Sequence, residues 1–305
     1  MTRTEPSSAA DRYLARATTG EPLLGDERGF VPLAAADPAL ETVADALRVA
    51  PEGLPDPGAA TAAPIPGESL SFAAPFDPGR LLGIGLNYAA HAADLDESSP
   101  EEPATFLKPR TSLAGPGGPI RLPPAEISDR VTAEAELAVV IGRTCRDVPV
   151  EAIGEVVAGY LPVIDCTAED VLQRNPRFLT RAKGYDTFLV AGSRVTVLGN
   201  DGTNGADGNG SPGADLDALD NPTVRTIVND SVVAENSVAN MRFSPAELVS
   251  FCSRSATLRP GDVISTGTPG AGVVAPGDTV RAEVDRIGTV GAPVVRDSGG
   301  AGDLS

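Results

Sequence analysis

Short apolar runs, rich in branched residues and separated by turn signals, recur along most of the chain. The clearest are RLLGIGLNY (residues 80–88), EAELAVVIG (134–142) and GYLPVID (159–165), which predict buried strands. Helical patterns are fewer, and the clearest is a capping box of Ser244 and Glu247 ahead of the run LVSFCSRSATL. Because strands outnumber helices and no regular strand–helix alternation is present, we expect an α+β, mainly β architecture.

A stretch rich in Pro, Gly and Ala, PEGLPDPGAATAAPIPGES, divides the chain near residue 70. We therefore expect a small N-terminal domain with its linker at residues 1–70 and a main domain at residues 71–298. The last residues, 299–305, read as a flexible tail.

An acidic segment of low complexity at residues 199–221 predicts a solvated surface insertion. A calcium loop that begins at Asp207 is the alternative. That pattern fails, because Pro212 stands where glycine is needed and Ala218 stands where glutamate is needed.

The formal net charge of −18, with a pI near 4.4, repels phosphate backbones and excludes nucleic acid as an expected partner. No run of about 18 apolar residues is present, and no apolar run follows the first basic residue. We therefore expect a cytoplasmic protein that does not engage a membrane. Three cysteines, Cys145, Cys166 and Cys252, are set among apolar neighbours, which indicates reduced, buried thiols.

Lysine is almost absent: among the 24 Lys+Arg residues, only Lys108 and Lys183 are lysine, and the others are arginine. A codon bias toward arginine explains this pattern, and adaptation to a salt-rich cytoplasm, where an acidic surface preserves solubility, is the alternative. In either case, lysine is kept at two positions. We expect that these positions need the compact ammonium group of lysine, because the planar guanidinium group of arginine has a different geometry.

Glu134 and Glu136 are two residues apart in a predicted strand, so their side chains face the same way, with α-carbons about 7 Å apart. Apolar residues follow them and indicate a buried strand, where two like charges need a compensating cation. Asp165 ends the next predicted strand and could add a third carboxylate. Three oxygen ligands suit Mg²⁺, Mn²⁺ or Ca²⁺ rather than zinc. The alternative is an exposed strand start with solvated carboxylates.

Six segments occur in the order found in the fumarylacetoacetate hydrolase family: GIGLNYAAHAADL, FLKPRTSLAGPGGPI, EAELAVVIG, GYLPVIDCTAED, RAKGYDTF and LRPGDVISTGTPG. They span residues 83–270, and they resemble the bacterial and archaeal branch of acylpyruvate hydrolases and oxo-diacid decarboxylase–isomerases. The resemblance implies a mixed β-sandwich roll that assembles as a homodimer or higher homo-oligomer. It also implies that the metal, Mg²⁺ or else Mn²⁺ or Ca²⁺, is held by Glu134, Glu136 and Asp165.

The resemblance also assigns catalytic groups. In family members, a histidine and a carboxylate three residues later lie on a short lid helix and handle a water or a proton; they match His91 and Asp94. Glutamate is usual at the position of Asp94, so the shorter side chain is a departure. Lys183 matches the lysine that meets negative charge developing on the substrate. The alternative for His91, the single histidine of the chain, is a surface position without a task.

Substrate contacts follow from the same resemblance. Lys108 would line the mouth of the pocket, and the turn TGTPG would hold a substrate carboxylate. A structural lysine and a tight turn built on glycines are the alternatives. Glu169 stands where many relatives carry the arginine of TARD. The full set of expected substrate contacts is Tyr88, Lys108, Asp186, Thr266, Gly267 and Thr268.

The function implied by the resemblance is hydrolysis of a C–C bond in a small 1,3-dioxo acid, an acylpyruvate-like substrate, through an enolate stabilised by the metal. Closure of a lid over residues 88–100 would exclude water. The alternatives are decarboxylation or isomerisation of a 2-oxo diacid in aromatic catabolism and dehydration of a sugar acid. A non-catalytic acidic metal-binding protein is the alternative from another class.

If the acidic surface reflects salt adaptation, the activity and the melting temperature will both rise between low and molar KCl, because salt screens repulsion among the carboxylates. Activity assays and thermal melts across a KCl series measure both quantities. A flat profile would instead favour codon bias as the reason for the scarcity of lysine.

Overall fold

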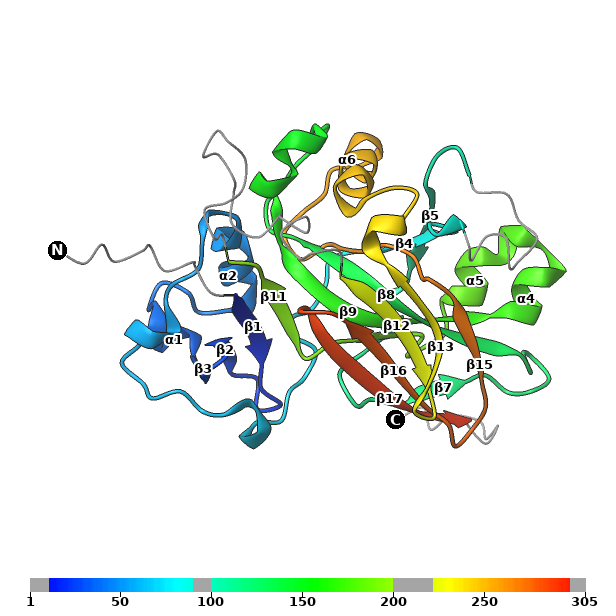
Figure 1. Cartoon of the computed structure of the whole chain (residues 1–305), viewed down its shortest axis with the longest axis horizontal. Coiled ribbons are helices and arrows are strands. Elements are labelled where there is room, and N and C mark those ends of the chain that lie inside the picture. The colour runs from blue at the N-terminus through cyan, green and yellow to red at the C-terminus, as the bar shows by residue number, and fades with distance from the viewer. Residues whose placement is uncertain (1–10, 90–99, 200–221, 297–305) are drawn as a thin grey trace, which may run out of the picture.

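The computed structural model describes residues 11–89, 100–199 and 222–296 (Figure 1). The expected lid positions His91 and Asp94, most of the acidic insertion and the C-terminal tail lie outside the described residues. In the described part, no helix has both the length and the apolar character that a membrane span requires. The expected mainly β architecture is confirmed.

A twelve-stranded mixed sheet forms the centre of the molecule, in the order β3-β2-β1-β11-β9-β8-β14-β4-β5, with β6, β10 and β15 paired to it off this path. The strands are β1 (Arg12–Arg16), β2 (Pro22–Asp26), β3 (Gly29–Pro32), β4 (Leu81–Gly85), β5 (Ala104–Lys108), β6 (Leu113–Ala114), β8 (Val131–Ile141), β9 (Val157–Ala168), β10 (Leu189–Ala191), β11 (Arg194–Val197), β14 (Val263–Ser265) and β15 (Ala271–Val274). The three apolar runs predicted to be strands became β4, β8 and β9.

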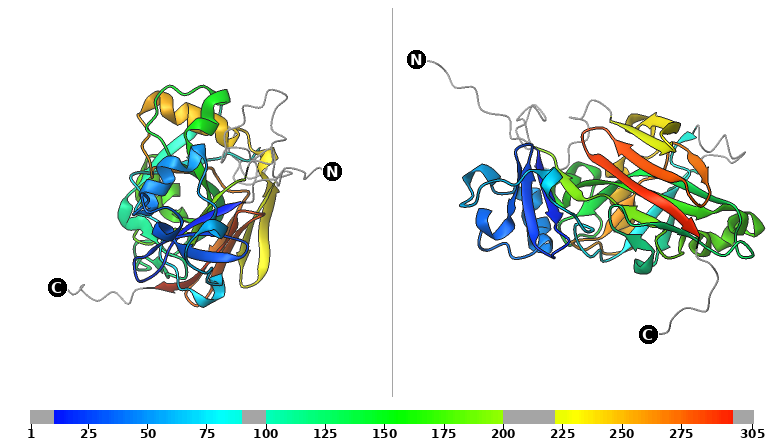
Figure 2. Two further views of the ribbon diagram at one scale, coloured as in Figure 1. Left: turned by 90° about the vertical axis from the view of Figure 1, so that its left-hand side faces the viewer. Right: turned by 90° about the horizontal axis from the view of Figure 1, so that it is seen from below.

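A second sheet of five strands has the order β13-β12-β16-β17-β7. Its strands are β7 (Ile120–Leu122), β12 (Thr223–Val228), β13 (Ser231–Ser237), β16 (Thr279–Val284) and β17 (Gly288–Arg296). Seen from below, β16 and β17 cross one side of the larger sheet (Figure 2). The two sheets therefore form a sandwich.

The described helices are short, and the longest of them begins at the predicted capping box, where Ser244 accepts a hydrogen bond from Glu247 N and Glu247 accepts one from Ser244 N. The α-helices are α1 (Leu33–Ala36), α2 (Val43–Val49), α4 (Glu169–Arg174), α5 (Leu179–Lys183) and α6 (Pro245–Ser255). Short 3₁₀ helices cover Ala50–Glu52, Pro57–Ala59, Gly67–Ser69, Arg110–Ser112, Val150–Glu155, Pro176–Phe178 and Val238–Asn240.

Two hydrophobic cores lie on opposite faces of β8 and β9, because alternate side chains of a strand point to opposite sides. One core joins Ala135, Leu137 and Val139 to the five-stranded sheet and α6. The other joins Ala138 and Val140 to β1, β2 and α2. Every residue of β8 and β9 is consequently buried.

The N-terminal elements extend the larger sheet, since β1 pairs antiparallel with β11 as well as with β2. In Figure 1 these elements lie together at one end of the molecule, with α2 beside β1 and β11. The division of the chain near residue 70 stays a prediction.

The Thr226 hydroxyl ties the two sheets together at the level of the strand that carries the carboxylates. It accepts a hydrogen bond from Ala135 N at 3.0 Å and donates one to Gly270 O at 2.9 Å, and Thr226 is fully buried. The variant Thr226→Val keeps the shape but leaves Ala135 N without this partner, and it removes one of the two hydroxyl hydrogen bonds to Gly270 O, of which Thr268 makes the other. We expect the free energy of unfolding to fall by about 1–3 kcal/mol, as measured by urea denaturation.

The matched control is Thr289→Val on an exposed position of β17, where surface substitutions stay within about 0.5 kcal/mol. Equal stability losses in the two variants would show that the inter-sheet hydroxyl has no special role.

Candidate metal centre

The pairing register of β8 and β9 sets Glu134 directly opposite Asp165, and Glu136 opposite Val163. Ligand oxygens of Glu134, Glu136 and Asp165 all lie within 4.8 Å of one another. These residues are 6%, 1% and 0% exposed, so the carboxylates are removed from water. The structure thus brings together the three residues that the sequence indicated as ligands, on the same sheet face as Ala138 and Val140.

Both lysines of the chain bind this cluster. Lys183, at the end of α5, donates hydrogen bonds from Nζ to Glu134 Oε2 at 2.9 Å and to Asp165 Oδ2 at 3.0 Å. Lys108 Nζ, on β5, donates to Asp165 Oδ1. Lys108 is only 4% exposed, so it lies deeper than the pocket mouth where we expected it. The cause is its ion pair with Asp165, which draws the ammonium group inward.

Phe106 completes the wall beside Lys183, whose Nζ lies 5.1 Å from the centre of the ring. The ring packs on Gly83, where a Cβ atom would be 2.1 Å from it. This contact explains why β4 carries a glycine at position 83, since any larger side chain would collide with the ring.

The electrostatics of the cluster follow from burial and mutual charge. Burial, reinforced by the charge of Asp165, raises the pKa of Glu136 to about 8. Burial also opposes ionisation of Asp165, but the ammonium groups of Lys108 and Lys183 outweigh it and hold the pKa of that carboxyl below its usual range. The pKa of Lys183 is raised because attraction by Asp165 and Glu134 outweighs desolvation. Desolvation lowers the pKa of Lys108.

A turn after β14 holds Glu136. Glu136 Oε2 accepts hydrogen bonds from Ser265 Oγ at 2.5 Å and from Gly267 N at 2.8 Å. Gly267 has φ of +98°, and a Cβ atom there would lie 2.8 Å from Asn87 Cβ. Only glycine combines this backbone conformation with so close an approach. The expected TGTPG turn therefore positions a metal-ligand candidate.

Two contacts were missed from the sequence. Ser265 directly precedes the TGTPG run, and its hydroxyl faces Glu136. Thr167 Oγ1 donates to Glu134 Oε1 at 2.8 Å. Thr167 stands two residues after Asp165 in the same strand, and that spacing is a signal that could have found it.

The other expected substrate contacts lie at different depths. The Thr266 hydroxyl donates to Leu137 O at 2.8 Å, and the Thr268 hydroxyl donates to Gly270 O at 2.9 Å, so both already have partners within the protein. Asp186 is exposed in the turn after α5. Among the residues that the structure describes, it makes no contact with the carboxylate cluster.

Tyr88 is fully buried, and its hydroxyl oxygen has no hydrogen-bond partner within the described residues. Burial and the charge of Glu136 raise the pKa of this phenol, so it stays protonated. Neighbouring Asn87 is anchored, because its Nδ2 donates to Thr266 O and Phe243 O. Tyr88 therefore offers an uncommitted proton donor near Glu136.

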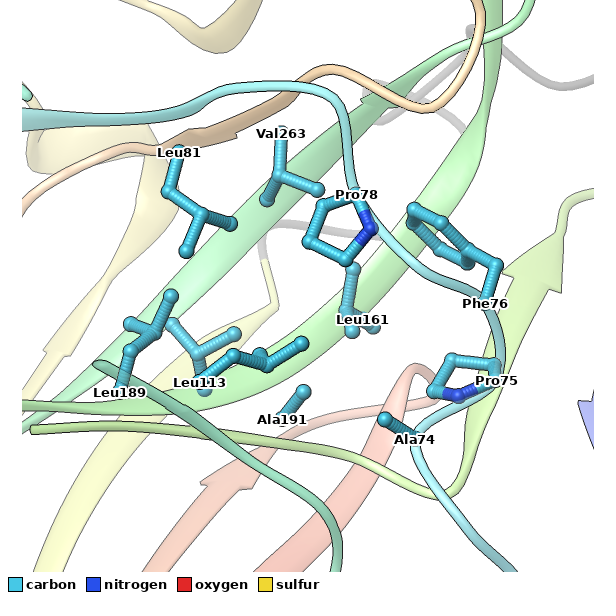
Figure 3. Close-up of a pocket in the computed structure, with 11 residues that line it drawn as sticks. Ala74, Pro75, Phe76, Pro78, Leu81, Leu113, Leu161, Leu189, Ala191 and Val263 are labelled. Atoms are coloured by element: carbon cyan, nitrogen blue, oxygen red, sulfur yellow. The ribbon is translucent and has the colours of Figure 1, made fainter. Parts of the chain in front are cut away.

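A separate hollow lies between the segment 74–78 and the larger sheet (Figure 3). Its lining is apolar, with Leu81, Leu161 and Val163 on the sheet side, and its volume is about 10 Å³. A space of that size holds at most one water. Its described lining contains no side chain that could bind a metal or an oxo-acid.

The residues of the cluster fit a hard divalent cation. All three ligand candidates offer oxygen, the donor type that Mg²⁺ and Mn²⁺ prefer. With all groups ionised, the three carboxylates and two ammonium groups carry one net negative charge. Without a metal, a proton on Glu136, whose pKa is raised, would neutralise that charge. The position of Lys183 between Glu134 and Asp165 further shows that this pair of oxygens accepts a cation.

Comparison with known proteins places this geometry in a family. The chain matches the family described as fumarylacetoacetate (FAA) hydrolase C-terminal over residues 80–295. The mitochondrial oxaloacetate tautomerase fahd2 of Xenopus laevis is 32% identical over 240 residues, which cover 74% of this chain and 69% of that protein.

Two solved structures cover nearly the whole chain. 5-Carboxymethyl-2-hydroxymuconate delta-isomerase from Mycobacterium smegmatis is 33% identical, with a TM-score of 0.70 over 93% of this chain and 100% of that chain. Maleylpyruvate hydrolase from Sphingobium sp. SYK-6, solved in complex with manganese (II) ion and pyruvate, is 27% identical, with a TM-score of 0.69 over 94% and 100%. Because the family match spans most of the sequence and a relative above 30% identity covers about three quarters of it, the chain belongs to the fumarylacetoacetate hydrolase family and is an enzyme of that family.

Proposed function

We propose that this enzyme hydrolyses a C–C bond in a small 1,3-dioxo acid of the acylpyruvate type, with a divalent metal held by Glu134, Glu136 and Asp165. The observation that supports the proposal most is the convergence of three buried carboxylates within 4.8 Å of one another. Their burial next to Lys183 would suit a cation held by the carboxylates together with an anionic oxygen of the substrate. Mg²⁺ is the proposed metal, with Mn²⁺ and Ca²⁺ as alternatives.

A bound divalent cation would supply Lewis-acid stabilisation of the negative charge that develops on the 2-oxo acid. Lys183 would place its ammonium group beside the same oxygen, in a setting where burial strengthens every charge interaction. The Tyr88 hydroxyl, which has no partner among the described residues, would donate a further hydrogen bond to the substrate. Lys108 would keep Asp165 ionised and in position.

The water would be activated by His91 with the assistance of Asp94, both assigned through the family resemblance. Water adds to the carbonyl carbon of the acyl group, and the C–C bond to the pyruvate methylene then breaks. The leaving enolate takes a proton at carbon, which gives pyruvate and a carboxylic acid. Asp186 and the turn at Thr266–Thr268 stay proposed substrate contacts, and closure over residues 88–100 stays a proposed lid.

A second candidate is isomerisation or tautomerisation of a 2-oxo diacid, with decarboxylation as a related outcome. It is favoured by the two relatives of highest identity among the three described, a delta-isomerase at 33% and an oxaloacetate tautomerase at 32%. This chemistry needs the same enolate but no water, so the carboxylates and Lys183 would serve it equally. Analysis of products by mass distinguishes it from hydrolysis and from dehydration of a sugar acid.

A cytoplasmic location and a homodimeric or higher homo-oligomeric state also belong to the proposal. They rest on the reduced cysteines and on the family resemblance. Size-exclusion chromatography with light scattering measures the assembly directly.

Metal removal tests the cluster. We expect EDTA treatment to abolish turnover and Mg²⁺ or Mn²⁺ to restore it, because the buried negative charge then loses and regains its counter-ion. Added metal should also raise the melting temperature of the metal-free protein, since it binds only the folded state. In Glu136→Gln both responses should be lost, with turnover down at least about 100-fold.

The matched control is Glu151→Gln, which removes the same charge from an exposed 3₁₀ turn and should keep both responses. Full turnover of the EDTA-treated enzyme would refute the metal role.

Substitution of His91 tests the water-activating step. We expect His91→Ala to lose hydrolysis of an acylpyruvate by about 100-fold or more, because the general base is removed. The rise in melting temperature with Mn²⁺ should persist, because the carboxylate cluster remains. Unchanged turnover in His91→Ala would rule out water activation by His91 and Asp94 and would favour the isomerase alternative.

A further inference from the structure

A row of polar side chains leads away from the carboxylate cluster toward the ends of β8 and β9. Thr132 precedes Glu134 on the same face of β8, and Thr167 follows Asp165 on the same face of β9. Both threonines are almost fully buried, at 3% and 2% exposed. Their hydroxyl oxygens lie 3.4 Å and 2.8 Å from Glu134 Oε1.

Glu169 stands at the outer end of this row, as the first residue of α4. Its Oε1 lies 3.5 Å from Thr132 Oγ1, so a single hydroxyl separates it from Glu134. The backbone amide of Glu169 donates to Arg130 O at 2.9 Å, which fixes where the side chain starts. Glu169 is therefore a fourth acidic group next to the cluster, and the proposed chemistry does not use it.

The outer end of the row lies nearer to solvent than the cluster does. Glu136 is 1% exposed and Glu134 is 6% exposed, whereas the Glu169 side chain is 15% exposed and that of Arg130 is 53% exposed. At the other end, Ser265 and Gly267 hold Glu136 by hydrogen bonds. A substrate that is anchored at the cluster and extends toward solvent on this side of the site passes Glu169.

The charge at the outer end is dominated by Glu169. Arg130 pairs with it, but the Arg130 Nε lies 4.0 Å from Glu169 Oε2, and its side chain is 53% exposed. Such exposed pairs are weakly coupled. The Glu169 carboxylate is closer to the interior, where screening is weaker. A second anionic group on the substrate would meet repulsion at this point.

Resting on the proposed function, we propose that Glu169 is a specificity-determining residue that disfavours substrates with a carboxylate at the acyl end. The preferred substrates are then acylpyruvates whose acyl group is uncharged. The residue acts through its charge on the bound substrate and takes no part in bond breaking.

Two probes that differ only at the acyl end test this inference: butanoylpyruvate ends in a methyl group and succinylpyruvate ends in a carboxylate. Wild-type enzyme with Mg²⁺ should prefer butanoylpyruvate. In Glu169→Gln, kcat/KM for succinylpyruvate should rise about tenfold relative to butanoylpyruvate, because one unit of repulsion is removed at nearly constant shape. Arg130→Gln should change the same ratio in the opposite direction.

The matched control is Glu155→Gln, an exposed glutamate at the opposite end of β9, which should leave the ratio unchanged. Melting temperatures check that each variant is folded. The gain in Glu169→Gln should shrink in 1 M KCl, where the screening length falls to about 3 Å.

If wild type and Glu169→Gln both turn over the two probes with the same ratio of kcat/KM values, the role of Glu169 is overturned and the proposed function stands. Turnover of neither probe by wild type would overturn the proposed function, and the specificity role with it. If Glu155→Gln changes the ratio as much as Glu169→Gln does, the effect comes from the net charge of the protein, and the specificity role of Glu169 is also overturned.

Discussion

Placing Glu134 opposite Asp165 across two buried antiparallel strands is the constraint on which the site depends. Like charges at directly opposed positions repel, and burial adds the cost of leaving water. The ammonium group of Lys183 lies between them at 2.9 Å and 3.0 Å and offsets both effects. The position of α5 is thereby linked to the pairing of β8 with β9, so the scaffold and the chemistry cannot vary independently.

The sandwich provides the surroundings that make these charges effective. One core covers the odd-numbered side chains of β8 and the other covers Ala138 and Val140 beside the carboxylates. Water is excluded from both faces, so each charge acts across a poorly screened medium. The inter-sheet bonds of Thr226 hold β8 at Ala135, between the two glutamates, and connect the rigidity of the second sheet to the spacing of the ligands.

Much of this could be predicted from the sequence, because the controlling patterns are local. Alternation placed Glu134 and Glu136 on one face, and the capping box located α6. The strand register could not be predicted, since a slip of one residue turns every side chain to the other face. The inward position of Lys108 and the bond from Ser265 to Glu136 depend on that register. They became visible only when distant strands were placed side by side.

The burial of both lysines has a consequence for chemical labelling. Lys108 is 4% exposed and Lys183 is 6% exposed, and the sequence contains no others. Reagents that acylate lysine amines therefore find no target on the outside of the folded protein. Any lysine adduct that forms reports an opening of the catalytic interior, which makes the rate of such labelling a direct measure of how often this enzyme admits small molecules.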